Sequence, residues 1–375
     1  MAITVRATRR VGVQQRLAVV HSSSGFGAAA TGASSPKWLN AFPGRLRTTL
    51  AATYGDAGTG FVPATATVHA TPAYDPRWGF GGTVTDVALG WHRSACFRVA
   101  GGTGNFVEFT PTQPVREFVV TTLLGTSGYG RATIDGGTEV TFRNQTGGTA
   151  PTIERSSGFH AGHVVTRIPA ATLGVHTLRV WGDAQLDIVG VEGRTGSGGL
   201  VVDNASVNGK SLGSLGAANS AANDEATGAY GLPMLDTLLA LGSGPVLIGL
   251  TSNEWNSTTT TTVLRSRLDI AIARVRASGR DPFLYVQPQP DPSLQGGAMT
   301  YTELRDVTLA AASTAGIPVL DQWRMWSSPT QTSEATIYAD GAALGRYADT
   351  IHPNDAGAAD IAASLRTFLS VQYGI

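Results

Sequence analysis

Two residues near the end of the chain have the types and the spacing that suit catalysis. Asp349 and His352 stand three positions apart in the segment Asp349-Thr350-Ile351-His352-Pro353-Asn354, so both side chains can lie on one side of a turn. A carboxylate beside an imidazole fixes the tautomer of the ring and supports its positive charge, as a general base requires. Pro353 disfavours helix at His352, and a helix is expected over 356–369. The sequence therefore predicts a pair on a loop before a helix; the alternative is an ordinary surface Asp and His.

Three other segments follow apolar runs that are typical of buried strands. Ser22, Ser23 and Ser24 follow a run that ends at Val20, Gly209 follows another, and Asn253 follows a third. Loops outside the carboxyl ends of parallel strands carry the reactive groups of α/β folds. Acyl transfer requires a hydroxyl nucleophile, a base oriented by a carboxylate, and donors aimed at the developing oxyanion. A Gly lets a carbonyl approach a backbone N–H closely, and an Asn amide is a second kind of donor.

Strands and helices alternate in the two outer parts of the chain. The expected strands lie at 16–20, 200–202, 245–250, 283–286 and 317–320, and the expected helices at 43–54, 233–241, 261–278, 301–315 and 356–369. This alternation predicts an α/β fold with a parallel sheet and helices on both of its faces.

The middle of the chain has a different pattern. From about Gly58 to Arg194 there is no helical periodicity, and Val/Thr/Phe-rich runs recur between Gly, Pro and Asp clusters. The expected strands lie at 106–109, 117–124, 132–134, 139–143, 163–168, 176–181 and 186–192. We predict a β-sandwich or jelly roll of roughly 130 residues, inserted into the α/β domain.

Composition limits the classes of partner. The 375 residues suggest about two domains, and Lys+Arg equals Asp+Glu at 27 each, which gives no electrostatic reason to expect nucleic acid or an acidic membrane surface. The single Cys96 excludes an internal disulfide and a Cys-based zinc site. No apolar run approaches the roughly 20 residues of a membrane span, and the first residues lack the apolar region of a secretory signal. The compartment stays open, with a phage virion or another extracellular location among the alternatives.

The four loops together resemble the sequence blocks of the SGNH (GDSL-type) hydrolase family, in order and in structural context. The matching segments are Val19–Gly27 with Ser23 at the nucleophile position, Asn204–Gly209, Gly249–Glu254 with Asn253 at the oxyanion position, and Asp349–Asn354. The resemblance covers about 14–62 and 200–375. It implies a flavodoxin-like three-layer hydrolase domain formed by 1–62 and 198–375, interrupted at 63–197 by an inserted β-sandwich that resembles carbohydrate-binding modules.

The resemblance also implies roles for single residues. Ser23 would attack an ester carbonyl, His352 would accept its proton, and Asp349 would orient His352. The oxyanion would lie among the backbone N–H groups of Ser23 and Gly209 and the side-chain amide of Asn253. Neither a cofactor nor a metal is implied.

The chain departs from the family pattern around the nucleophile. His21-Ser22 stands where the family has Gly-Asp, and three consecutive serines leave the nucleophile open among Ser22, Ser23 and Ser24. The third block has an extra residue before Asn253, and Glu254 replaces an Asp. His21 is expected either to line the substrate site or to be a packed loop residue.

Other candidate binding residues are aromatic or basic. Trp255, two residues past Asn253, is the tryptophan best placed to stack on a sugar. His160 and His163 have a spacing that suits a metal, but without a second cluster of ligands we favour ordinary surface residues.

These observations lead us to expect a serine esterase that acts through an acyl-enzyme. The expected substrate is an acyl ester, in the first place an O-acetyl ester, on a polysaccharide or cell-wall glycan. One alternative is a lipase or an esterase for lipid-like envelope esters. Another is a phage-tail or adhesion protein with a retired site. The oligomeric state is open.

Overall fold

The computed structural model describes residues 14–30, 36–65, 68, 70, 75–88, 95–123, 128–143, 159–160, 163–206, 211–212, 235, 238–239, 241–250 and 252–375. Of the helices within these ranges, none combines the length and the apolar character needed to cross a bilayer.

A five-stranded parallel sheet is the centre of the α/β part. Its strands, in spatial order, are β14 (Gly199–Asn204), β1 (Gln14–Val20), β15 (Val246–Leu250), β16 (Pro282–Val286) and β17 (Val319–Asp321). All four pairings are parallel. Numbered along the chain, this is the order 2-1-3-4-5, which reverses direction at β1. The predicted parallel sheet is therefore confirmed.

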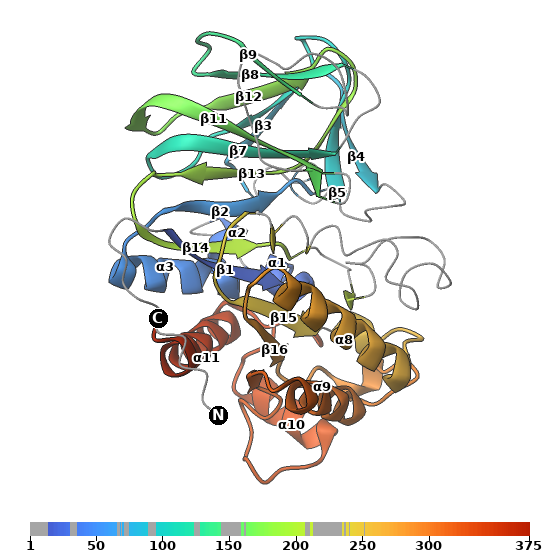
Figure 1. The fold of residues 1–375 in the computed structure, drawn as a ribbon. Coiled ribbons are helices and arrows are strands. Elements are labelled where there is room, and N and C mark those ends of the chain that lie inside the picture. Colours follow the sequence, from blue (N-terminus) through green and yellow to red (C-terminus); the bar gives the residue numbers. More distant parts are fainter. Residues whose placement is uncertain are drawn as a thin grey trace.

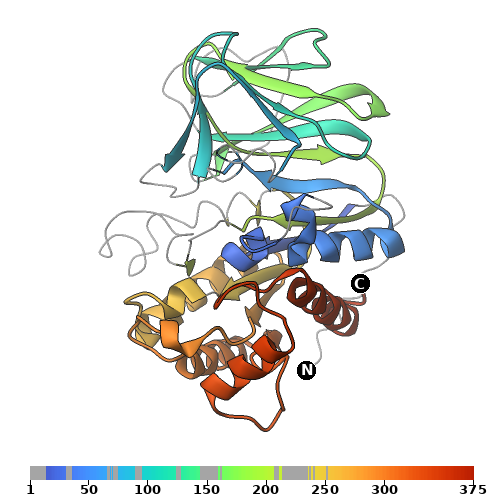
Figure 2. The same ribbon diagram turned by 180° about the vertical axis from the view of Figure 1, so that it is seen from behind.

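Helices cover both faces of this sheet (Figures 1 and 2). One face carries α3 (Phe42–Tyr54) and α11 (Asp355–Tyr373), and the other carries α8 (Thr261–Ala277) and α9 (Tyr301–Ala315). Successive side chains of a strand point to opposite faces, so Leu17 and Val19 belong to the core cluster of α3 and α11. Ala18 and Val20 belong to the cluster of α8 and α9. This two-sided burial explains why β1 is apolar along its whole second half.

The other named strands, β2 to β13, form two antiparallel sheets from residues 58–194, drawn in the upper part of Figure 1. The first contains β10 (Phe159–His160), β11 (His163–Gly174), β7 (Val115–Leu123), β13 (Leu186–Arg194), β5 (Ala95–Val99) and β4 (Val84–Ala88), with β2 (Gly58–Pro63) also paired to β13. The second contains β3 (Trp78–Gly81), β6 (Phe106–Phe109), β12 (Leu178–Gly182), β8 (Tyr129–Ile134) and β9 (Val140–Arg143). Side chains of both sheets form one hydrophobic cluster.

The first antiparallel sheet is buried on both of its faces. On β7, Phe118 and Val120 contribute to the cluster shared with the second sheet. The intervening Val119 contributes to the cluster of α8 and α9. The hydrophobic core of the α/β part therefore continues into the β-rich part.

Buried charges also join the two parts. Arg16 on β1 donates to Glu192 on β13 over 2.6 Å and, through Nε, to Asp203 on β14 over 2.9 Å. All three side chains are at most 2% exposed. Burial alone would lower the pKa of Arg16, but the two carboxylates outweigh burial and raise it. Asp203 also accepts the backbone N–H of Phe61 on β2, over 2.9 Å.

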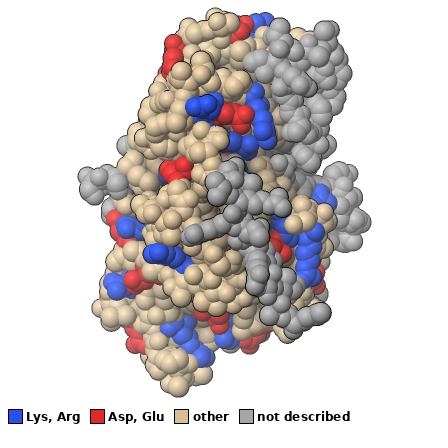
Figure 3. Space-filling view, turned by 60° about the vertical axis from the view of Figure 1, so that its left-hand side comes forward, with Lys and Arg blue, Asp and Glu red and all other residues tan. Residues whose placement is uncertain are grey.

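Charged residues of both signs are interspersed on the face shown in Figure 3. Oppositely charged side chains also form ion pairs at the surface of the β-rich part. Arg179 contacts Glu108 over 2.7 Å, and Arg131 contacts Asp183 and Glu139. Local pairing of this kind matches the formal net charge of zero.

Candidate functional site

The predicted site residues follow strands at the carboxyl edge of the parallel sheet. The three serines follow β1, and Asn253 lies on the one-turn helix α7 (Ser252–Trp255) that follows β15. The segment from Gln287 to Pro292 follows β16. Gly209 lies outside the described residues; the strand before it, β14, ends at Asn204. Ligand sites of open α/β sheets lie at this edge, where the strand order reverses.

The serine loop forms a single helical turn, α1 (Ser23–Phe26). Ser22 is the N-cap residue, but its side chain makes no capping hydrogen bond, and the turn ends at Gly27, whose φ of 86° requires glycine. Ser22 Oγ is buried and has no hydrogen-bond partner among the described residues, whereas Ser24 Oγ donates to Gln287 Oε1 over 3.4 Å. Ser23, at the first helical position, is 3% exposed. The three hydroxyls thus have three different environments.

Asp349 and His352 form the hydrogen-bonded pair that the sequence predicts. His352 Nδ1 lies 2.8 Å from Asp349 Oδ2. Asp349 Oδ1 accepts the backbone N–H groups of Ile351 and His352, over 2.7 and 2.6 Å. Burial acts to raise the pKa of Asp349, but the hydrogen bonds from His352 and Ile351 outweigh burial and lower it. A carboxylate at Nδ1 places the proton on that nitrogen and leaves Nε2 as the basic atom.

The loop after β16 contacts both the serine turn and the histidine loop. Gln287 accepts the hydrogen bond from Ser24, and the backbone N–H of Asp291 donates to the carbonyl of Thr350 over 2.9 Å. The hydroxyl of Tyr347 donates to the carbonyl of Gln289. Although the structure describes both Ser23 and His352, no hydrogen bond joins their side chains. The 287–291 loop therefore brings their two segments to the same edge of the sheet.

This loop is the part of the site that we did not predict from the sequence. Gln289 is fully buried and accepts the indole N–H of Trp323 over 2.6 Å. The available signal was its position: it follows a strand at the edge that already carried the other site loops.

Asn253 lies on α7, and its side chain is partly buried. The neighbouring Glu254 is completely buried and accepts a hydrogen bond from Arg267 on α8 over 3.1 Å. Glu254 therefore anchors the short helix that carries Asn253. Glu254, which stands where the family has an Asp, thus has a structural role.

Two predicted substrate-binding residues are instead packed in the interior. Trp255 has no exposed surface and lies edge-on to Tyr301, with ring centroids 5.9 Å apart. A side chain without exposed surface cannot stack on a sugar, so in this structure Trp255 is a packing residue. His21 is 2% exposed, which favours the packed-loop alternative over the substrate-lining one.

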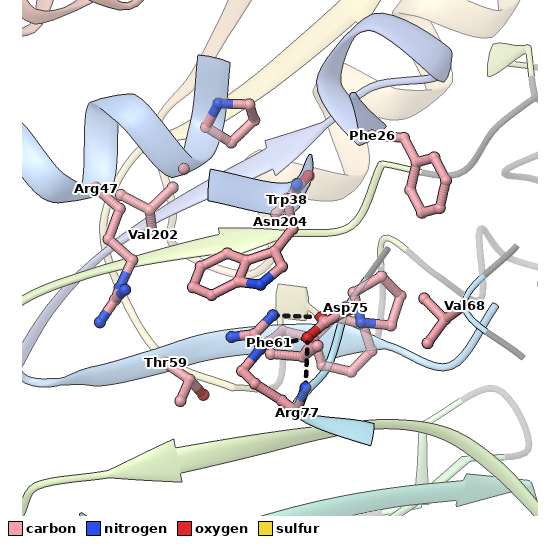
Figure 4. Close-up of a pocket in the computed structure, with 14 residues that line it drawn as sticks. Phe26, Trp38, Arg47, Thr59, Phe61, Val68, Asp75, Arg77, Val202 and Asn204 are labelled. Carbon is pink, nitrogen blue, oxygen red and sulfur yellow. Dashed lines mark hydrogen bonds and ion pairs between the residues drawn. The ribbon is translucent and has the colours of Figure 1, made fainter. Parts of the chain in front are cut away.

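A cavity of about 40 Å³ is lined in part by Phe26, the last residue of the serine turn (Figure 4). Within it, Arg77 lies over the ring of Trp38, 3.6 Å from the centroid, and donates to Asp75 over 2.8 and 2.6 Å. The lining includes Phe26 and Asn204 but none of Ser23, Asn253 or His352. The volume is also far below that of sites that bind drug-sized ligands. This cavity is therefore separate from the candidate active site.

No group of three or more His, Cys, Asp or Glu side chains that could hold a metal occurs among the residues described. His160 and His163 pair with each other across strands β10 and β11.

The sheet order, the helices on both faces and the serine and histidine loops at one edge define a fold of the SGNH hydrolase type, as the sequence resemblance implied. A solved structure of a peptidoglycan O-acetylesterase matches with a TM-score of 0.68 and 14% identity, over 96% of this chain and 91% of that one. At this identity the likeness establishes the fold alone.

Two further solved structures are less similar. A Bacillus subtilis protein matches with a TM-score of 0.39 and 16% identity, over 79% of this chain and 91% of that one. A family two carbohydrate esterase from Clostridium thermocellum, in complex with cellohexaose, matches with a TM-score of 0.31 and 11% identity, over 78% and 98% of the two chains. No protein-family model matches the chain, and no curated protein matches it in sequence.

Proposed function

We propose that this protein is a serine esterase that removes O-acetyl groups from a polysaccharide or cell-wall glycan. The observation that carries the proposal is the Asp349–His352 hydrogen bond of 2.8 Å, at the sheet edge that also carries the serine turn. An imidazole oriented by an ionised carboxylate is suited to take a proton from a hydroxyl. The shared fold with a peptidoglycan O-acetylesterase, over 96% of the chain, supports the choice of ester.

Ser23 is the proposed nucleophile. Ser22 is the N-cap residue and lies outside the helical turn, and Ser24 Oγ is directed to Gln287. Ser23 stands at the first helical position, where the backbone N–H has no partner within a helix. That N–H can therefore take part in stabilising an oxyanion.

The reaction would proceed in two acyl-transfer steps. Ser23 Oγ bonds to the acetyl carbon while its proton passes to His352 Nε2, and the charge on the carbonyl oxygen is stabilised by the N–H groups of Ser23 and Gly209 and the amide of Asn253. The bond to the sugar oxygen then breaks, and His352 returns the proton to the leaving hydroxyl. Water, deprotonated by His352, then attacks the acyl-Ser23 ester, the bond to Ser23 Oγ breaks as His352 returns the proton to that oxygen, and acetate is released.

We further propose that 63–197 is an inserted β-sandwich that holds the glycan near this edge. The two antiparallel sheets and their common core support this reading. The catalytic part would then be assembled from 1–62 and 198–375.

Acetate release from O-acetylated peptidoglycan and acetylated xylan tests the function. The expected result is acetate release by the wild type and its loss in Ser23→Ala. Ser22→Ala and Ser24→Ala are the matched controls, since they remove neighbouring hydroxyls of the same turn. Hydrolysis restricted to long-chain nitrophenyl esters would contradict the substrate class. Failure of a fluorophosphonate probe to label the wild type would contradict the serine mechanism.

A further inference from the structure

The side chain of His21 takes the place of a helix cap for the serine turn. Its Nδ1 accepts the backbone N–H of Ser22 over 2.9 Å and that of Gly25 over 3.3 Å. Gly25 is the third helical residue, whose N–H an N-cap side chain ordinarily binds. Ser22 occupies the N-cap position but does not supply that bond. The acceptor therefore comes from the residue before it.

The imidazole occupies a slot built by four elements. It lies edge-on to Phe42 on α3, with centroids 5.3 Å apart and planes at 79°, and 5.5 Å from the ring of Tyr285 on β16. A Cβ on Gly249 of β15 would lie 2.1 Å from His21 Cδ2. A Cβ on Gly25 of α1 would lie 2.8 Å from His21 Cβ. Gly249, on the strand before Asn253, thus makes room for this ring, and Gly25 lets the serine turn pack closely against the base of the side chain.

The hydrogen bonds fix the protonation state of the ring. Because Nδ1 accepts two N–H groups, the proton of the neutral ring must be on Nε2, which is buried and has no partner in the part of the chain that the structure describes. Burial lowers the pKa of His21 to about 3, so the ring stays neutral at ordinary pH. A leucine at position 21 would fill the slot without burying an unpaired Nε2–H group. What histidine adds over leucine is therefore the pair of hydrogen bonds at Nδ1.

The cap does not include the N–H of the proposed nucleophile. His21 holds the N–H groups of Ser22 and Gly25, on either side of Ser23 in the sequence. The N–H of Ser23 has no acceptor among the described residues. Because the turn is held at the amides of Ser22 and Gly25, the N–H and the Oγ of Ser23 keep a fixed position relative to each other.

We infer that His21 is a positioning residue, which fixes the serine turn through Nδ1 so that Ser23 can present its hydroxyl to His352 and its N–H to the oxyanion. This inference rests on the proposed function. It also gives a physical reason for the departure from the family's Gly-Asp at this place in the sequence.

Three substitutions separate positioning from packing. In His21→Asn, the amide oxygen can replace Nδ1 as acceptor. In His21→Gln, the longer side chain places its amide near the position of Nε2 instead. His21→Leu fills the slot without an acceptor. Misplacement of a reacting group by about 1 Å costs about 10²-fold, so we expect kcat for nitrophenyl acetate to fall about 10²-fold in His21→Leu and His21→Gln, with KM within about twofold. His21→Asn should keep kcat within about tenfold of the wild type.

Hydrogen exchange supplies a readout that does not depend on activity. The amides of Ser22 and Gly25 should be protected in the wild type and in His21→Asn, and exchange faster in His21→Leu. Equal kcat in the wild type and His21→Leu, or equal losses in His21→Asn and His21→Leu with both folded, would overturn the inference. If His21→Leu does not fold, kcat is compared between His21→Asn and His21→Gln. Equal kcat in these two variants would then overturn the inference. A protected turn in a wild type that hydrolyses no ester would contradict the proposed function and the positioning role, while confirming the cap.

Discussion

The buried His21 predicts a defined loss of stability in mild acid. Burial lowers the pKa of its ring from the ordinary 6.5 to about 3 in the folded protein. Between these values the unfolded chain binds a proton that the folded protein does not. The contribution of the neutral ring to the free energy of unfolding is therefore fully present above pH 6.5 and decreases as the pH falls to about 3. Each pH unit in this window corresponds to about 1.4 kcal/mol, so His21 alone should lower the free energy of unfolding by about 2 kcal/mol between pH 7.5 and pH 5.

Urea unfolding of the wild type and His21→Asn, followed by tryptophan fluorescence at several pH values, measures this contribution. Other titrating groups affect both proteins equally, so the difference between their unfolding free energies isolates His21. His176→Asn is the control, because the hydrogen bond to Asp135 raises the pKa of the partly buried His176. The stability from His176 is present at low pH and is lost as the pH rises, which is the opposite sign. A wild-type-minus-His21→Asn difference that is flat from pH 5 to 7.5 would refute the burial of a neutral ring.

Three further predictions concern the site and the junction. Asp349→Asn should lower kcat about 10³–10⁴-fold, because an amide no longer stabilises the imidazolium of His352; steady-state ester hydrolysis checks this, and an unchanged kcat would remove Asp349 from the mechanism. Asn253→Ala should lower kcat about 10²–10³-fold. A variant with a raised KM and an unchanged kcat would argue against an oxyanion role for Asn253. Arg16→Met leaves two buried carboxylates without their cation and should lower the free energy of unfolding, measured in urea, by about 3–5 kcal/mol. The control Arg131→Met, at a partly exposed ion pair, should lower it by at most about 1 kcal/mol. Equal losses in the two variants would contradict the buried network.

The features that are encoded locally could be predicted from the sequence. The Asp349–His352 pair needs only a three-residue spacing and a turn, and the structure forms it. The strand Phe106–Phe109 and the helix that begins near Pro43 follow from short periodic patterns bounded by Gly and Pro. The alternation of strands and helices was sufficient to predict the parallel sheet.

Features that depend on distant parts of the chain could not be predicted in this way. Trp255 follows Asn253 by two residues, but which way it points depends on α9, which places Tyr301 against it. The role of His21 depends on Gly249, which has no side chain to fill the slot and lies more than two hundred positions away. Sequence position indicates that such residues are near the site. Whether they face the substrate or the core is decided by packing that the local pattern does not contain.

The double burial of the first antiparallel sheet has a consequence for how the protein can be divided. Val119 on β7 faces the α/β core, while Phe118 and Val120 face the second sheet. A recombinant fragment that contained only the β-rich segment would expose the Val119 face to water, and an α/β part without that segment would lose Val119 from its hydrophobic core. Glu192 would also be lost from around Arg16. The segment is therefore unsuited to transplantation as an independent module, and biochemical work on either half should use the intact chain.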